Sequence, residues 1–217
     1  MSGALRVTGL TVAYPGKPPH TAVKGVDLEV PAAGSVAIVG PSGCGKSSLL
    51  MAIAGVIASS GRVELGGRDV TNVAPHKRDI GLVFQDGQLF PHLSVAGNVA
   101  FGLEMKSWPK PLRKERVAQM LALVDLEGLG ERGVGELSGG QRQRVALART
   151  LAPSPTVVLL DEPLSSLDTE LRGRLAVEVR SVLERSGASW IVVTHDLDEA
   201  SAMADRTLTM ENGTLLT

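Results

Sequence analysis

The sequence contains a single cysteine, Cys44, and few aromatic residues, with two tryptophans, one tyrosine and three phenylalanines among 217 residues. No internal disulfide can form, which excludes a disulfide scaffold and makes a reducing compartment the natural interpretation. A chain of this length can bury a sizeable core without cross-links, and it suits one large domain or a domain with a subdomain. We therefore expect a cytoplasmic protein.

The sequence also lacks an excess of charge of either sign and any long hydrophobic run. It has 22 basic and 23 acidic residues, mixed along the chain, so neither nucleic acid nor a lipid surface is expected as a partner. The N-terminus lacks the positive start and apolar run of a signal peptide. The longest apolar run, residues 49–58, has about half of the roughly 20 residues that a bilayer-spanning helix needs. Membrane attachment is therefore expected only through a partner.

Short apolar runs alternate with helical patterns along most of the chain. The first thirty residues alternate apolar and polar side chains, as in half-buried strands, with a turn at residues 15–19. Residues 35–40, 80–84, 156–161 and 190–195 are apolar almost throughout, as in parallel strands covered on both faces. Helical patterns cover residues 46–54, 140–151, 169–185 and 196–204. This alternation predicts an α/β fold with a central, mostly parallel sheet and an antiparallel sheet beside it.

Residues 86–151 break this rhythm. They contain no strand-like run but have helical stretches near residues 94–104 and 112–124, followed by a glycine-rich segment at 128–135. We interpret the region as an inserted α-helical subdomain. The expected organisation is a single domain of residues 1–217, with 1–85 and 156–217 forming the α/β core and its antiparallel β subdomain, and 86–155 forming the helical subdomain.

The segment GPSGCGKS, residues 40–47, matches G-x-x-x-x-G-K-[ST] and lies between a predicted buried strand and a predicted helix. Its glycines allow backbone N–H groups to surround phosphate oxygens at the positive end of that helix. Lys46 would reach the β- and γ-phosphates and Ser47 would hold Mg²⁺, so we predict ATP and Mg²⁺ as cofactors. Cys44 is better explained as a small residue that fits the loop than as a reactive thiol. The predicted nucleotide contacts here are Gly40, Pro41, Ser42, Gly43, Cys44, Gly45, Lys46, Ser47 and Ser48.

Two acids, Asp161 and Glu162, follow the apolar run at residues 156–161. Ligands of open α/β sheets gather at such strand ends. Asp161 suits an outer Mg²⁺ ligand, and Glu162 suits the base that orients an attacking water. By itself an acid pair after a strand is more often a turn or a helix cap, but beside a phosphate loop the catalytic interpretation is favoured.

A second glycine-rich helix start lies at Ser138, Gly139, Gly140 and Gln141. Ser138 suits the N-cap position, and an ordinary capped helix is the simpler alternative. However, two glycines in the first turn lower helix propensity by about 1 kcal/mol each and leave N–H groups open at a positive helix end. This design favours a second anion-binding surface.

Together these motifs resemble the nucleotide-binding subunits of ABC transporters, and the resemblance covers the chain from about residue 5 to its C-terminus. LSGGQ at residues 137–141 is similar to the family signature, and VVLLDEP at 157–163 to its Walker B motif. The resemblance implies a phosphate-loop NTPase core and an ATPase that converts ATP and water to ADP and phosphate, coupled to transport.

The resemblance also assigns roles to single residues. Tyr14 is similar to the aromatic residue that stacks on adenine, although a strand-end aromatic is the alternative. Gln85 is similar to the glutamine that touches Mg²⁺ or water and senses the membrane partner. Residues 165–168, SSLD, resemble the loop that adds Asp168 to the nucleotide contacts. His195 resembles the switch histidine, so the implied catalytic residues are Lys46, Gln85, Glu162 and His195, and the implied metal ligands are Ser47, Gln85 and Asp161.

The resemblance further implies partners. A second copy would form an ATP-sandwich dimer in which Ser138 and Gly140 contact the nucleotide held by Lys46 of the other copy. Transmembrane permease subunits would attach the chain to the cytoplasmic face of the membrane, with an extracytoplasmic solute-binding protein involved indirectly. Residues 89–103, LFPHLSVAGNVAFGL, resemble the importer type, with Leu89, Phe90, Pro91 and His92 as docking candidates, although export is not excluded.

Two alternatives remain at this point. One is a soluble ABC-type ATPase that acts on translation or DNA, for which the tandem cassettes or long coiled-coil insertion are lacking. The other is a nucleotide-binding module without hydrolysis, which the presence of all the expected catalytic residues disfavours. The sequence stops soon after a strand-like TLTM run and an ENG turn. We therefore expect no C-terminal regulatory domain, in either a short family member or a shortened chain.

Overall fold

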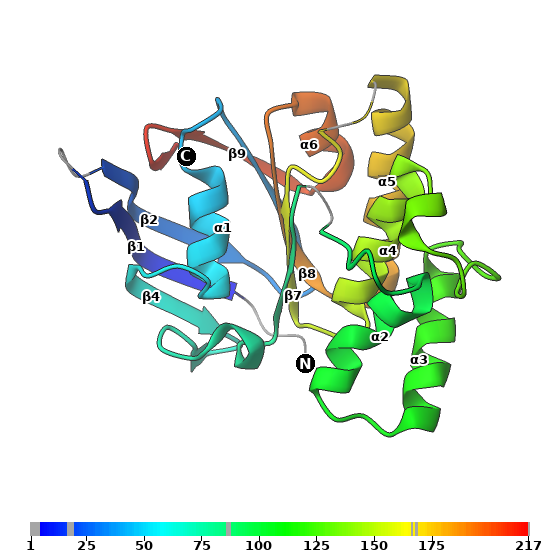
Figure 1. Ribbon diagram of the computed structural model, residues 1–217. Coiled ribbons are helices and arrows are strands. Elements are labelled where there is room, and N and C mark those ends of the chain that lie inside the picture. The colour runs from blue at the N-terminus through cyan, green and yellow to red at the C-terminus, as the bar shows by residue number, and fades with distance from the viewer. Residues whose placement is uncertain (1–4, 17–19, 86–87, 166, 168, 217) are drawn as a thin grey trace.

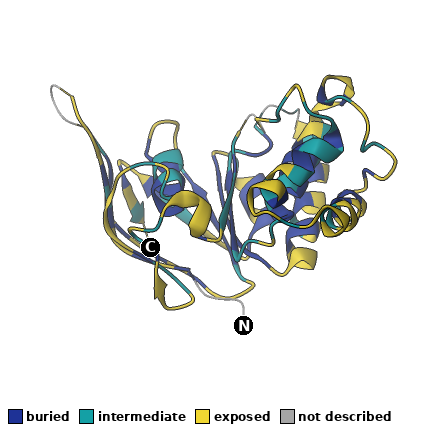
Figure 2. Ribbon diagram, turned by 60° about the horizontal axis from the view of Figure 1, so that its bottom comes forward, coloured by how far each residue is buried: buried dark blue, intermediate teal, exposed yellow. Residues whose placement is uncertain are grey.

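The computed structural model describes residues 5–16, 20–85, 88–165, 167 and 169–216. Two sheets lie side by side, with helix α1 (Lys46–Ala54) between them and the other helices on the far side of the larger sheet (Figure 1). Buried residues run through both sheets and the inner faces of the helices, and exposed residues cover the outside (Figure 2).

The smaller sheet is antiparallel, with strand order β2-β1-β4-β5. Strand β1 (Leu5–Tyr14) pairs with β2 (His20–Val30) and with β4 (Ser60–Leu65), which in turn pairs with β5 (Arg68–Asp69). The register with β2 shifts around Gly9, whose φ of 59° suits a bulge. Apolar side chains of β1 point inward on either side of the shift, so the expected alternation is preserved.

The larger sheet is parallel except at one edge, with strand order β10-β9-β3-β8-β7-β6. Four strands follow the apolar runs of the sequence: β3 (Ser35–Val39), β6 (Ile80–Val83), β7 (Val157–Asp161) and β8 (Ser189–Thr194). Strand β9 (Arg206–Glu211) pairs with β3 in parallel. Strand β10 (Thr214–Leu216) pairs with β9 antiparallel and forms the edge of the sheet.

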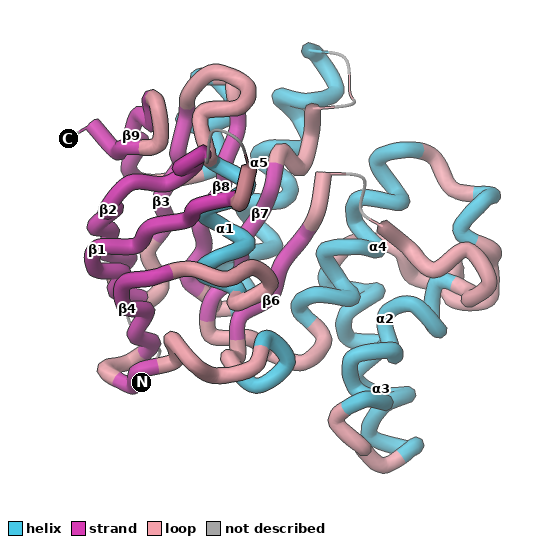
Figure 3. Tube along the Cα trace, turned by 60° about the vertical axis from the view of Figure 1, so that its left-hand side comes forward, coloured by secondary structure: helices cyan, strands magenta, loops and turns pink. Residues whose placement is uncertain are grey.

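Helices α2 (Val95–Met105), α3 (Lys110–Leu123) and α4 (Gly139–Leu151) gather on one side of the molecule (Figure 3) and are called the helical layer here. Helix α5 (Thr169–Ser186) packs against α4, and α6 (Leu197–Met203) packs against α5 and the larger sheet. Two 3₁₀ turns lie at Pro75–Lys77 and Val134–Glu136. Trp190, which is 2% exposed, donates from its indole N–H to the Met203 carbonyl at 2.7 Å and anchors α6 to the sheet.

The predicted fold class is confirmed, with a phosphate-loop α/β core, an antiparallel β sheet and an inserted helical region. Strands β4, β5 and β10 were not predicted, and part of the expected turn at residues 15–19 lies outside the described residues. Within the described chain, no helix combines the length and apolar character needed to cross a membrane.

Candidate functional site

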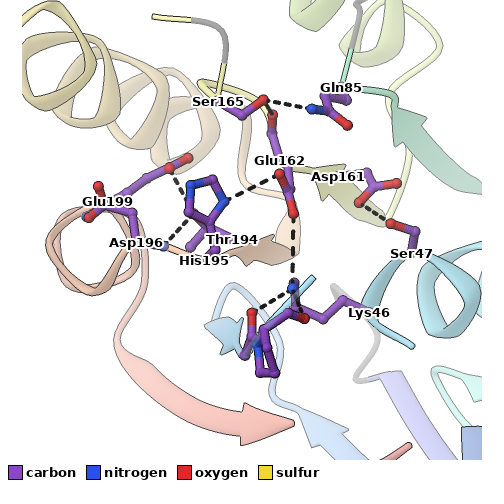
Figure 4. A network of polar contacts seen from close by, with 12 residues as sticks. Lys46, Ser47, Gln85, Asp161, Glu162, Ser165, Thr194, His195, Asp196 and Glu199 are labelled. Atoms are coloured by element: carbon purple, nitrogen blue, oxygen red, sulfur yellow. Dashed lines mark hydrogen bonds and ion pairs between the residues drawn. The ribbon is translucent and has the colours of Figure 1, made fainter. Parts of the chain in front are cut away.

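The ends of three parallel strands bring the predicted catalytic residues to one edge of the larger sheet. Val39 of β3 lies opposite Thr194 of β8, and Asp161 of β7 lies opposite Val193 of β8. Because parallel strands finish at the same edge, the segments that follow them meet there. These segments are residues 40–47, 162–165 and 195–196. Figure 4 shows the resulting polar network.

The phosphate loop passes very close to neighbouring backbone. A Cβ atom on Gly45 would lie 2.1 Å from the Ala22 carbonyl oxygen, and one on Gly40 would lie 2.2 Å from the Met210 carbonyl oxygen. Gly45 also has φ 109° where α1 begins, a conformation that only glycine adopts easily. By contrast, a Cβ on Gly43 would meet no atom within 4 Å. Two loop glycines are therefore required by packing.

Lys46 is 4% exposed, and its ammonium group points back into the loop. Its Nζ donates to the carbonyl oxygens of Gly40 at 2.7 Å and Pro41 at 3.1 Å, and lies 3.9 Å from Glu162 Oε1. A buried ammonium needs such partners, because an unpaired charge away from water is costly. The group is thus held at the mouth of the loop, next to the acid that follows β7.

Ser47 and Asp161 form the second part of the network. Ser47 Oγ donates to Asp161 Oδ1 at 2.8 Å. Burial raises the pKa of Asp161, the hydrogen bond from Ser47 opposes the rise, and the neighbouring Glu162 adds to it. A hydroxyl and a carboxylate side by side are oxygen ligands of the kind that Mg²⁺ prefers. Among the described residues, no group of three or more histidine, cysteine or acidic side chains gathers as a self-sufficient metal site. The pair therefore fits a cation shared with a phosphate ligand.

Glu162 and His195 form the third part. His195 Nδ1 lies 3.3 Å from Glu162 Oε2, and the imidazole is about half exposed. Glu162 has φ 43°, which is uncommon outside glycine, and its backbone N–H donates to the Val193 carbonyl at 2.9 Å. Backbone strain of this kind gathers at functional sites. The turn places one carboxylate between the ammonium of Lys46 and the imidazole of His195.

Gln85 follows β6 and reaches the same network from the other side. Its Nε2 donates to Ser165 Oγ at 3.0 Å, and Ser165 Oγ in turn donates to the Glu162 carbonyl at 3.1 Å. Gln85 contacts neither Asp161 nor Ser47 in the hydrogen bonds recorded for the described residues, so its predicted place as a metal ligand stays a prediction.

Tyr14 lies at the end of β1, and its hydroxyl is 3.0 Å from Ser48 Oγ, at the start of α1. Tyr14 is 38% exposed, so part of its surface is open to a ligand, and an aromatic ring can stack on a planar one. This position beside the phosphate loop suits the predicted adenine contact.

The second glycine-rich helix start lies apart from this network. Ser138 Oγ accepts from the Gln141 N–H at 3.2 Å, and Gln141 Oε1 accepts from the Ser138 N–H at 2.9 Å, which makes a capping box. A Cβ atom on Gly140 would lie 3.2 Å from the Leu175 side chain. Helix α4 packs on the opposite face of the larger sheet from α1 (Figure 1), and no bond among the described residues joins the two starts. Asp168 lies outside the described residues.

Sequence reasoning missed three residues behind the site: Arg172, Thr194 and Glu199. Thr194 Oγ1 donates to Glu199 Oε2 at 2.8 Å, beside His195 (Figure 4). Burial raises the pKa of Glu199, whose side chain is 3% exposed. For Glu199, the sequence offered one signal: it is an acid four residues after His195, near the start of a predicted helix.

These features define a nucleotide-binding domain of the phosphate-loop class. A profile described as ABC transporter matches residues 23–165. The chain is 44% identical over 216 residues to the spermidine/putrescine import ATP-binding protein PotA of Ruegeria pomeroyi, covering 99% of this chain and 59% of that protein. It is 49% identical over 210 residues to the Fe(3+) ions import ATP-binding protein FbpC of Streptomyces coelicolor, covering 96% and 60%. It is also 49% identical over 194 residues to the sulfate/thiosulfate import ATP-binding protein CysA of a Synechocystis strain, covering 89% and 55%.

A solved dimeric ATP-binding cassette, in a post-hydrolysis state with ADP and Pi, superposes with a TM-score of 0.85 at 30% identity, covering 98% of this chain and 97% of that one. The chain therefore belongs to the ABC transporter family. It spans between 55% and 60% of the length of the three curated relatives above.

Proposed function

We propose that this chain binds Mg-ATP and hydrolyses it, and that it works as the ATPase subunit of an ABC importer. The observation that carries the proposal is the meeting of Lys46, the Ser47–Asp161 pair and the Glu162–His195 pair at one sheet edge. The names of the relatives, all import ATP-binding proteins, support the transport role.

Each part of the network has a distinct task. The loop N–H groups and Lys46 would bind the phosphates, Ser48 and Tyr14 lie where the nucleoside would enter, and Ser47 with Asp161 would hold Mg²⁺. When bound, Mg²⁺ neutralises charge that develops on the phosphate oxygens. Glu162 accepts a proton from the attacking water, and His195 keeps its carboxylate in place. Gln85, which bonds to Ser165 beside Glu162, links the catalytic residues to the part of the chain that follows β6.

The active form would be a dimer of two copies. The Ser138 hydroxyl uses its oxygen as a helix cap, so its O–H remains able to donate to an anion. Because Ser138 is exposed and separated from the chain's own phosphate loop, its ligand would be the nucleotide held by a second copy. This agrees with the dimeric state of the solved cassette. The proposed division is a core of residues 1–85 and 156–217 and a helical subdomain of residues 86–155.

A groove between β6 and the helical layer would receive the permease. Its volume is about 840 Å³ and its lining is largely apolar. Of the four docking candidates, Phe90 lines this groove; its ring lies 4.5 Å from that of Phe101 and 5.2 Å from the Arg149 guanidinium. A short amphipathic helix fits such a groove. The chain would then lie at the cytoplasmic face of the membrane, with a solute-binding protein serving the same permease.

The substitution Glu162→Gln tests the hydrolytic role. It keeps the side chain's shape and removes the proton acceptor, so we expect phosphate release to slow by about 10²- to 10⁴-fold while ATP still binds. Size-exclusion chromatography with Mg-ATP should then show a stable dimer. Glu170→Gln, an exposed acid in the first turn of α5, is the matched control. Hydrolysis by Glu162→Gln at the wild-type rate would refute the assignment of the base.

The transport role has its own test. We expect the tagged chain, purified from detergent-solubilised native membranes, to retain a permease that mass spectrometry identifies. Retention of ribosomal or DNA-repair proteins, with no membrane protein, would instead favour the soluble ATPase.

A further inference from the structure

Arg172 connects two loops of the site from behind. It lies in the first turn of α5 and is largely buried, with a side chain 18% exposed. Its Nη1 donates to Asp196 Oδ2 at 2.8 Å, and its Nη2 donates to the Leu167 carbonyl oxygen at 2.8 Å. One planar guanidinium thus bonds at the same time to the segment after β7 and to the segment after β8.

Each of these segments carries a residue of the proposed catalytic pair. Glu162 starts the segment that contains Leu167, and His195 directly precedes Asp196. Asp196 cannot turn away from Arg172 without losing other bonds, because its Oδ1 accepts from the N–H groups of Asp198 at 2.9 Å and Glu199 at 3.0 Å. The carboxylate is therefore shared between the cap of α6 and Arg172.

His195 is placed by its neighbours. On one side Thr194 Oγ1 donates to Glu199 Oε2 and accepts from the Asp196 N–H at 3.1 Å. On the other side Asp196 is bonded to Arg172. The imidazole itself is about half exposed and meets Glu162 at 3.3 Å. The position of the ring relative to Glu162 thus depends on the residues before and after it.

Unpaired buried polar atoms also occur beside this contact. Among the described residues, four buried side-chain atoms lack a hydrogen-bond partner, and two of them, Arg172 Nε and Glu199 Oε1, lie here; the other two are the Nε atoms of Arg113 and Arg144. Buried polar atoms are normally paired, and exceptions call for an explanation. The unpaired Nε therefore does not single out Arg172; its two outer nitrogens do, because each bonds to a different loop of the site.

We propose that Arg172 is a positioning residue, which holds the segments after β7 and β8 in register so that His195 stays against the Glu162 carboxylate. This inference rests on the proposed function, since it concerns the same catalytic pair. Arg172 acts through Leu167 and Asp196.

Kinetics give the first test. We expect Arg172→Ala to lower kcat for ATP hydrolysis by about 10- to 100-fold, because misplacement of a catalytic pair by about 1 Å has effects of this size. KM for ATP should change less than about twofold, since no phosphate-binding residue is touched. Arg172→Lys should be intermediate, because one ammonium cannot reproduce the planar fork. Arg174→Ala, an exposed arginine on the same helix, is the matched control.

A measurement without turnover separates this inference from the proposed function. The chain has four histidines, so the His195 ring signal can be assigned in NMR spectra by its loss in His195→Gln. Glu162→Gln should shift this signal in the wild type and in Arg174→Ala, but much less in Arg172→Ala. An equal shift in the Arg172→Ala background would overturn the inference, as would a wild-type kcat for that variant. If the NMR coupling is present but the wild type releases no phosphate, the proposed function fails and the positioning role stands.

Discussion

Replacing Gly45 by alanine should damage the phosphate loop far more than replacing Gly43, although both glycines belong to the same motif. Gly45 combines a φ of 109° with a Cβ position 2.1 Å from the Ala22 carbonyl oxygen. The obstacle is the backbone of β2, so a side chain cannot simply turn aside. Gly43, with φ 79°, has open space where its Cβ would stand.

The magnitudes follow from these two terms. A positive φ costs an alanine about 1–2 kcal/mol. The overlap at Gly45 adds about 1–3 kcal/mol, the usual range for forced backbone shifts. We therefore expect Gly45→Ala to lower the free energy of unfolding by about 2–5 kcal/mol and Gly43→Ala by about 1–2 kcal/mol.

Urea unfolding without nucleotide, followed by circular dichroism, measures both values, provided that the m-values agree. Nucleotide affinity of Gly45→Ala should also fall, because the Gly45 carbonyl accepts the Leu49 N–H at 2.9 Å at the start of α1. Equal stability of the two variants would show that the loop can relax around a Cβ at Gly45, which contradicts the packing argument.

Two further predictions concern charge and burial. Burial raises the pKa of Asp161, so the folded state binds the proton more tightly than the unfolded state, and this group's contribution to stability falls as pH rises through the folded pKa. Asp161→Asn should therefore be more stable than the wild type at pH 7 without nucleotide. The difference in stability should vanish below about pH 4, the pKa of an aspartate in the unfolded chain. A difference in melting temperature that does not change with pH over this range would contradict the prediction. Asn98 is fully buried, and its side chain bonds to the Phe90 N–H at 2.8 Å and to the Phe90 carbonyl at 3.1 Å. Asn98→Ala should lower the free energy of unfolding by about 1–3 kcal/mol for each buried group left unpaired, which thermal unfolding measures. It should also reduce transport, measured as uptake into vesicles, more than it reduces the ATPase rate of the isolated chain.

Local patterns predicted the elements that carry strong periodicity. Helix α1 has the predicted bounds, and Ser94 begins α2 as its N-cap, with its side chain accepting from the Gly97 N–H. Strand β4 was missed because its sequence, SGRVEL, places only Val63 in the core, and its other residues are partly or fully exposed. Its existence depends on pairing with β1, which is a long-range contact.

The candidate site could be predicted as residue types but not as an arrangement. The motifs supplied Lys46, Asp161 and Glu162, because each type has a known use beside phosphate, and the family resemblance supplied His195. Their mutual contacts arise from the order of the strands in the sheet, which no local pattern contains. Arg172 was missed for the same reason: in the sequence it is one charge on an amphipathic helix, and only the fold brings Asp196 to it.

The contacts of Lys46 bear on how strongly any anion can bind. Its ammonium group already has two carbonyl partners within the loop, at 2.7 and 3.1 Å, and a carboxylate at 3.9 Å. Two of its three N–H donors are thus taken by the chain itself, so a phosphate that needs more than the third donor competes with these internal partners. The measured affinity will then include the hydrogen bonds that Lys46 gives up inside the loop, and a change that weakens these internal bonds can tighten nucleotide binding without touching the nucleotide.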